Sequence, residues 1–294
     1  METPNSRSDQ PRPHLAEMTW PQARCAALNG GRVILLPVGA IEQHGPHLPV
    51  DLDNRIVVWL CQEAARRRPD LLMDVPPIHY GFNEHNMGFP GTVSVTIQNF
   101  INYVTDVCMS FVRQGHERIV LVNGHGSNAA LCALVARNVV NGSETALAAA
   151  INHWDLAREL AAQIRESPRG GMAHACEYET SWYLHLCPEL VQMDKAVADV
   201  LRQQSESVWV DIMEGDGPVA LIDDWSRVSN GSGVEGDPHT ASREKGERYA
   251  ETEISNLTAF CEDFKRMKTR PRRNYTARGS DSNPWFEDPT TEPQ

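Results

Sequence analysis

Apolar and polar positions alternate along the chain in blocks that are typical of an α/β fold. The run 33–38 is apolar throughout and lies between glycines, which is typical of a strand buried on both faces. The next segment, 54–67, has its apolar residues at helical spacing and predicts an amphipathic helix. Further strands are predicted over 71–78, 118–122 and 145–151, and further helices over 19–28, 96–113, 128–140, 174–186 and 241–268. Strands that alternate with helices in this way predict a mostly parallel sheet.

Composition narrows the class of protein. The 294 residues are 41% hydrophobic, which is enough for a large core, and we see no linker that would separate two cores. We expect one domain over residues 15–268, with flexible tails over 1–14 and 269–294. With a formal charge of −12, the chain lacks the excess of basic residues that is typical of nucleic-acid-binding proteins. No apolar run is long enough to span a bilayer, and the start of the chain has no signal core, so we expect a cytoplasmic protein with no membrane partner.

Candidate chemistry begins directly after the strand at 33–38. Glu42 and His44 are two positions apart in an extended segment, so their side chains can converge on one point. Asp53 follows in the same loop, where it could also serve as the cap of the next helix. Carboxylates and imidazoles without cysteine suit a divalent ion such as Zn, Mn or Fe. The seven cysteines form no CxxC pair, so a zinc-thiolate site is not expected.

Three later segments add polar residues near the ends of predicted elements. His125 falls at the carboxyl end of its strand, as Glu42 and His44 do, and such positions share one edge of a parallel sheet. The loop 79–94 is long and carries His85 and Asn86, which are candidates for substrate contact or for satisfying loop backbone. Trp154 follows a strand and forms either a pocket wall or part of the packing at a helix start.

A histidine and two glutamates stand together at the predicted start of the helix 174–186. His174, Glu177 and Glu179 could supply an acid–base pair or a further metal ligand. The two glutamates could instead simply complement the helix dipole. Cys176, directly before Glu177, has no clear histidine partner, and a metal-activated water would make a cysteine nucleophile unnecessary.

Five motifs, taken together, resemble those of the creatininase (creatinine amidohydrolase) family. Their order and spacing agree with the family from about residue 15 to residue 265. The motifs are Leu36-Pro-Val-Gly-Ala-Ile-Glu-Gln-His-Gly-Pro-His-Leu-Pro49 with Asp53, Phe89-Pro-Gly-Thr-Val-Ser94, Asn123-Gly-His-Gly-Ser-Asn128, His174-Ala-Cys-Glu-Tyr-Glu-Thr-Ser181 and Gly233-Val-Glu-Gly-Asp-Pro238.

The resemblance implies a single three-layer α/β/α domain, two divalent metal ions (zinc, manganese or iron) and a homo-oligomer, either a hexamer or a trimer of dimers. By motif position, Glu42 and His125 would bind one ion, His44 the other, and Asp53 would bridge them. His174 matches a histidine that contacts substrate and helps proton transfer. Trp154 matches an aromatic residue near the pocket, and Ser94 ends the second motif, where we expect a substrate contact.

The chain departs from creatininase itself after the third-motif histidine. Gly126 and Ser127 stand where that enzyme has a tyrosine and a metal-binding glutamate. We expect Glu179 to replace the missing ligand, with Glu177 as the next candidate and as a catalytic residue. A tryptophan–aspartate pair before His174 is also absent, so creatinine is not the expected substrate.

We therefore expect a metal-dependent hydrolase that cleaves the C–N bond of a small amide, cyclic amide or formamide. The first alternative is a hydrolase or lyase of a keto-sugar or cyclitol on the same two-metal centre. The second is a non-catalytic subunit of a biosynthetic pathway that keeps the fold.

Overall fold

A four-stranded parallel sheet forms the centre of the computed structural model, which describes residues 11–200, 205–215, 219 and 222–270. The strands stand in the order β2-β1-β3-β4. Their bounds are β1 Val33–Val38, β2 Leu72–Asp74, β3 Arg118–Asn123 and β4 Leu147–Asn152. Every residue of β1 is buried, because both faces of the sheet are covered, and this explains its continuous apolar run.

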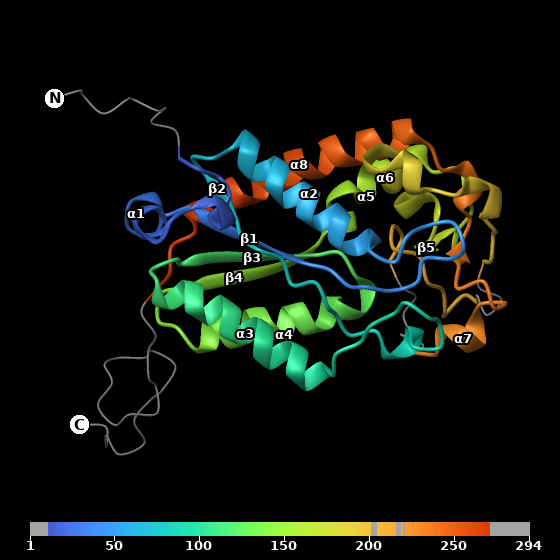
Figure 1. Ribbon diagram of the computed structural model, residues 1–294, viewed down its shortest axis with the longest axis horizontal. Helices are drawn as coiled ribbons and strands as arrows, with labels where there is room; N and C mark the ends of the chain where they lie inside the picture. Colours follow the sequence, from blue (N-terminus) through green and yellow to red (C-terminus); the bar gives the residue numbers. More distant parts are fainter. Residues whose placement is uncertain (1–10, 201–204, 216–218, 220–221, 271–294) are drawn as a thin grey trace, which may run out of the picture.

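Helices cover the two faces of the sheet, and the three layers are visible in Figure 1. Helices α2 (Leu52–Arg67) and α8 (Arg243–Arg266) pack on one face against Val33 and Leu35. Helices α3 (Ile97–Arg113) and α4 (Ala129–Asn141) pack on the other face against alternate residues such as Ile34. The period of two along a strand therefore divides β1 between two cores, and the predicted α/β/α architecture is confirmed.

The remaining elements lie mainly beyond the carboxyl ends of the strands, to the right in Figure 1, apart from α1 near the opposite end. Here a third apolar cluster packs around the fully buried Trp182, Tyr178 and Tyr183. The other regular elements are α1 Trp20–Gly30, α5 Arg158–Ile164, β5 Met172–His174, α6 Glu177–Leu186, α7 Trp225–Val228 and β6 Glu235–Gly236. Short 3₁₀ helices lie at Leu15–Glu17, Glu84–Asn86, Gly126–Asn128, His153–Ala157, Pro188–Leu190, Met193–Lys195 and Pro238–Thr240.

Three predicted boundaries need correction. The strand expected over 71–78 ends at Asp74, because prolines follow and only a single bridge joins Val38 to Ile78. His174 ends strand β5 rather than beginning a helix, and α6 starts at Glu177. Asp53 does not cap α2, because the N-cap position is occupied by Asp51 and Asp53 lies inside the first turn.

The expected N-terminal tail is partly docked on the sheet. Asp74 donates its backbone N–H to the Pro13 carbonyl oxygen at 3.1 Å, and the His14 ring lies 2.5 Å from the Asp74 carboxylate. The rest of the predicted tails, residues 1–10 and 271–294, lies outside the described residues. None of the helices that the structure describes combines the length and apolar composition needed to cross a membrane.

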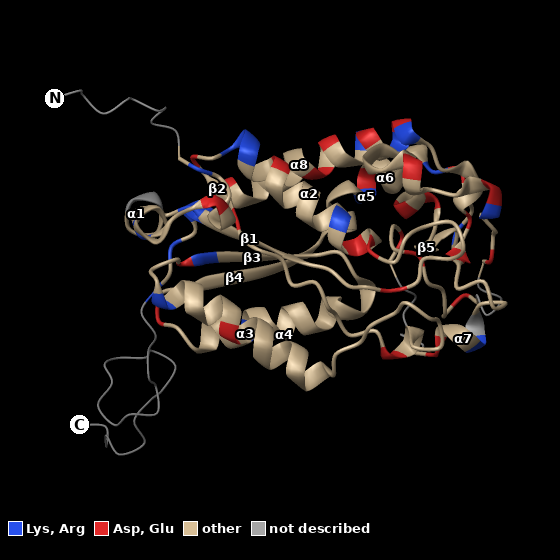
Figure 2. Cartoon of the chain, viewed as in Figure 1, with Lys and Arg blue, Asp and Glu red and all other residues tan. Residues whose placement is uncertain are grey.

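Charge is distributed unevenly over the two helical layers. Figure 2 shows acidic and basic residues along α2 and α8, whereas α3 and α4 carry few. Exposed apolar side chains occur on these two helices, including Ile97, Tyr103 and Leu134. The outer face of the α3/α4 layer is therefore the less polar of the two.

Candidate metal centre

Four of the predicted ligands meet beyond the carboxyl ends of β1 and β3. Glu42 and His44 follow β1, His125 follows β3, and Asp53 reaches the same point from the first turn of α2. All four side chains are almost fully buried. Gly124 allows this approach, because a Cβ atom there would lie 2.9 Å from the backbone oxygen of Asp53.

Asp53 lies between two histidines. Its Oδ1 atom is 3.2 Å from His44 Nε2, and its Oδ2 atom is 3.4 Å from His125 Nδ1. Glu42 Oε1 lies 2.8 Å from the same nitrogen of His125 and 3.8 Å from His44 Nε2. A carboxylate whose two oxygens face two separate imidazoles has the arrangement of a ligand that bridges two cations.

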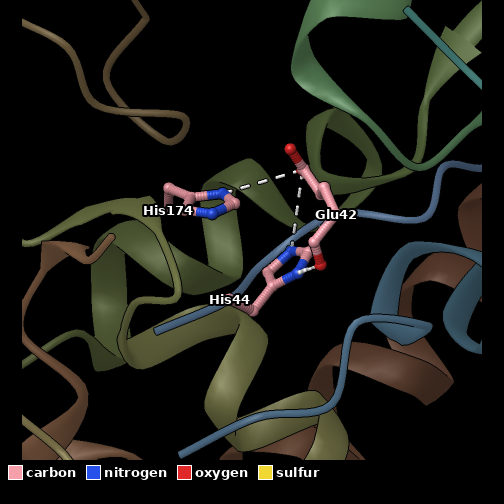
Figure 3. Close-up of side chains that lie close together, drawn as sticks. All are labelled: Glu42, His44 and His174. Carbon is pink, nitrogen blue, oxygen red and sulfur yellow. Dashed lines mark hydrogen bonds and ion pairs between the residues drawn. The ribbon is translucent and has the colours of Figure 1, made fainter. Parts of the chain in front are cut away.

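Glu179 joins this cluster from the first turn of α6. Its Oε1 atom lies 4.0 Å from His44 Nε2. Glu179, His44 and Asp53 offer ligand atoms within 4.8 Å of one another, and so do Glu42, His85 and His125. A third such group consists of Glu42, His44 and His174. Figure 3 shows both histidine rings of this third group beside the Glu42 carboxylate.

The donor set fits divalent cations on two structural grounds. His44 Nε2 and Asp53 Oδ2 are buried without a hydrogen-bond partner, although an unsatisfied buried polar atom costs about 1–3 kcal/mol. The other ring nitrogens are anchored, His44 Nδ1 to the Glu42 carbonyl oxygen at 3.2 Å and His125 Nε2 to the Phe82 carbonyl oxygen at 3.0 Å. Each imidazole therefore presents its remaining nitrogen to the centre of the cluster, as metal-binding histidines do.

Electrostatics in the cluster also favour positive charge. Burial alone would lower the pKa of His44, but Asp53, Glu179 and Glu42 outweigh it and raise the pKa to about 10. Burial raises the pKa of Glu179 to about 7, and the neighbouring carboxylates add to that effect. In the described part of the chain, the ion pairs of Glu42 and Asp53 are all with histidines. A cation would thus take the place of the proton that the neighbouring carboxylates stabilise on His44.

His174 is held in one tautomer beside the cluster. Its Nε2 atom lies 2.7 Å from the Gln43 carbonyl oxygen and donates its hydrogen there. The Gln43 side-chain nitrogen lies 3.0 Å from the same ring atom, but it donates its two hydrogens to Asn86 and to the Gly233 carbonyl oxygen, so it leaves none for the ring to accept. His174 Nδ1 is therefore unprotonated and lies 3.8 Å from Glu42 Oε1. Burial lowers the pKa of this histidine to about 4, so the ring is neutral.

A cavity of about 360 Å³ opens beside the cluster. Trp154 and His85, two candidates for substrate contact, line it, and so do two residues that the sequence reasoning missed, Trp225 and Arg158. The Trp225 ring centroid lies 4.6 Å from that of His174. Its segment shows no interpretable periodicity, so no sequence signal distinguished this tryptophan. Arg158 belongs to an ordinary helical pattern, which does not indicate that its side chain lines the cavity.

Two expected residues do not face the cavity. Glu177 is buried away from it, accepting the Ser167 backbone N–H at 2.8 Å and pairing with Lys245 at 2.6 Å, so the structure gives no support to a catalytic role. Ser94 does not line the cavity, because its hydroxyl accepts the Asn83 backbone N–H at 3.0 Å within the loop.

The surroundings of two further residues bear on the roles considered for them. Asn86 donates its side-chain amide to Glu42 Oε2 at 2.5 Å, so it orients a predicted ligand rather than facing substrate. Cys176 is fully buried, and burial raises the pKa of its thiol well above the ordinary value, which disfavours the thiolate form that a nucleophile needs.

Comparison with known proteins gives a consistent result. A family model described as Creatininase, creatinine amidohydrolase, matches residues 16–261. Creatinine amidohydrolase from Pseudomonas putida is 27% identical over 278 residues, which cover 85% of this chain and 96% of the relative. The mycofactocin precursor peptide peptidase of Mycolicibacterium smegmatis is 33% identical over 249 residues, with coverage of 82% and 87%. Among solved structures, a manganese creatininase superimposes with a TM-score of 0.73 at 26% identity, covering 86% of this chain and 98% of the other.

Proposed function

The chain belongs to the creatininase family of metal-dependent amidohydrolases, and we propose that it hydrolyses the C–N bond of a small amide with two divalent metal ions. The observation that carries the proposal is the position of Asp53, whose two oxygens face His44 and His125 separately. Zinc or manganese suits these imidazole and carboxylate ligands.

Two sets of residues would hold the ions. Glu42, Asp53 and His125 form one set, and His44, Asp53 and Glu179 form the other. When bound, the ions supply Lewis acidity, which lowers the pKa of water from about 15.7 towards about 7 and polarises a carbonyl group. Asn86 fixes the orientation of Glu42 through the hydrogen bond to Oε2, which leaves Oε1 directed at His125.

His174 moves the proton in this proposal. Its unprotonated Nδ1 atom takes a proton from the attacking water and returns it to the leaving nitrogen. The Gln43 carbonyl oxygen holds the opposite ring nitrogen and stabilises the imidazolium that forms between these two steps. The ring is neutral at the start, because its burial disfavours the charged form.

The cavity limits the substrate to a small molecule or to the end of a peptide. Its volume of about 360 Å³ lies at the lower end of the roughly 300–1,000 Å³ that is usual for small-molecule sites. Trp154 and Trp225 provide apolar walls for the part of the substrate that does not react. The two relatives described above, one named for creatinine and one for a precursor peptide, are both named for substrates with C–N bonds of the amide type.

A substrate panel tests the proposal. Zinc- and manganese-reconstituted protein is incubated with cyclic amides, formamides and short peptides, and release of amine, ammonia or formate is measured. We expect turnover of at least one amide class, and a loss of more than about 100-fold in Asp53→Ala, which removes a predicted ligand of both ions. A fully active Asp53→Ala that retains its metal would contradict the proposal. Turnover of keto-sugars or cyclitols alone would support the alternative chemistry on the same centre.

We also propose that the chain forms a homo-oligomer through the α3/α4 layer. Ile97, Tyr103 and Leu134 are 46%, 58% and 51% exposed on helices that carry few charges. Covering such side chains would remove apolar surface from water. Light scattering coupled to gel filtration should give a mass above that of one chain, and replacing Tyr103 and Leu134 with glutamate should lower it.

A further inference from the structure

The two predicted ligand sets are not equivalent, because one of them has an extra histidine beside it. His85 lies in the 3₁₀ helix Glu84–Asn86, which precedes α3. Its ring offers a nitrogen within 4.8 Å of ligand atoms of both Glu42 and His125. The described residues around His44 and Glu179 contribute no corresponding additional group beyond His174, whose Nδ1 lies 3.8 Å from Glu42 Oε1.

The surroundings of His85 leave one of its ring nitrogens available. In the described part of the chain, its only hydrogen-bond partner is the Ser127 hydroxyl, at 3.3 Å from Nε2 and 3.5 Å from Nδ1. One hydroxyl at nearly equal distances from both nitrogens can satisfy only one of them well. The second nitrogen therefore has no fixed partner within the protein.

The ring also packs against two other aromatic rings. It stacks on His125 with a centroid distance of 5.9 Å and an interplanar angle of 21°. The Trp225 ring lies beside it, with a centroid distance of 6.0 Å and an interplanar angle of 56°. Asn86, the next residue, binds Glu42 Oε2, so the segment that carries His85 is tied directly to a predicted ligand. Such fixed placement is expected of a ligand and is not needed for a surface histidine.

We propose that His85 is a further ligand of the ion held by Glu42, Asp53 and His125. This inference rests on the proposed function, because it requires that the cluster binds metal. The ion in this set then has four protein ligands, which is the number typical of a closed site. The other ion would be held by the three residues His44, Asp53 and Glu179, so water and substrate would reach the centre from that side.

Metal affinity of His85→Ala tests the inference. Protein stripped of metal is titrated with zinc against a chromophoric chelator, and cobalt-loaded protein is examined by visible absorption. We expect one of the two zinc ions to bind at least about 10-fold more weakly, with the other unchanged, and the cobalt spectrum to change in shape and intensity. His85→Gln serves as a second variant if His85→Ala unfolds, and it should weaken the same ion.

Two neighbouring substitutions provide matched comparisons. Trp225→Phe keeps an aromatic ring beside His85, so it should retain wild-type zinc affinity. Ser127→Ala removes the hydroxyl partner of His85, so it should weaken the same ion, but by less than His85→Ala does. If His85→Ala binds two ions with wild-type affinity and spectrum but has a raised KM, His85 contacts substrate and the inference is overturned. A wild type that binds two ions and hydrolyses no amide would instead refute the proposed function while this inference stands.

Discussion

Two glutamates in the first turn of α6 show how a buried carboxylate with partners differs from one without. Glu177 is fully buried, and its oxygens accept hydrogen bonds from Lys245 and from two backbone N–H groups. Glu179, two residues later, has a 3.4 Å contact with the Cys176 N–H and otherwise faces the His44 ring. Identical side chains in one helical turn thus have opposite surroundings.

The pKa values of the two groups express this difference. Burial would raise the pKa of Glu177, but Lys245 and the Ser167 contacts outweigh it and lower the pKa below its ordinary value. Burial raises the pKa of Glu179 to about 7, despite the opposing effect of His44. Glu177 therefore stabilises the fold as an ion, whereas Glu179 is best stabilised by a further cation. The comparison separates a structural carboxylate from a predicted ligand.

Removing Glu177 gives the largest expected effect on stability. Glu177→Ala leaves Lys245 partly buried without its main partner, and breaking such a pair costs about 3 kcal/mol at the lower end of the usual range. Urea unfolding of metal-free protein measures this cost. Glu166→Ala removes the exposed second partner of Lys245 and should cost less than about 1 kcal/mol. Equal stability of Glu177→Ala and wild type would contradict the stabilising role of Glu177.

Asn86 gives an intermediate effect, on metal affinity rather than on folding. Asn86→Leu removes the donor that orients Glu42, and loss of such a partner costs about 10- to 100-fold in metal affinity. Zinc titration against a chelator measures the loss, and Ser94→Ala in the same loop should leave the affinity unchanged. If Asn86→Leu has unaltered zinc affinity and a raised KM, Asn86 contacts substrate and does not orient a metal ligand.

Glu235 is a third buried carboxylate, and replacing it gives the smallest of the expected effects. Its Oε1 atom has no hydrogen-bond partner, and burial together with Asp199 raises its pKa to about 8. Between the ordinary value and about pH 8, the folded chain holds a proton that the unfolded chain has lost, so stability falls as pH rises. Glu235→Gln should gain about 1 kcal/mol relative to wild type between pH 7 and pH 8. An unchanged difference in unfolding free energy at the two pH values would contradict this.

Local patterns in the sequence were sufficient for most of the fold. The apolar run 33–38 and the helical stripe of 54–67 reflect burial against neighbouring layers, so both elements lie within two residues of their predicted bounds. His174 was placed in a helix because its neighbours favour one, whereas pairing of β5 with β6 makes it the end of a strand. That pairing joins residues about 60 positions apart, which no local pattern contains.

The candidate metal centre was likewise predictable only in part. Glu42, His44 and His125 follow predicted strands, so their convergence followed from the parallel order of the sheet. The different surroundings of Glu177 and Glu179 depend on Lys245 in α8 and on His44 in a distant loop. The position of Trp225 over His174 likewise depends on tertiary packing. These contacts cannot be obtained from spacing along the chain.

The most direct test of the account is the metal content of three proteins purified without chelator, namely wild type, Glu179→Ala and Glu177→Ala. We predict about two ions per chain in wild type and in Glu177→Ala, and about one in Glu179→Ala, because only Glu179 faces the cluster. Two ions in Glu179→Ala, or the loss of an ion in Glu177→Ala alone, would contradict the assignment of the two glutamates.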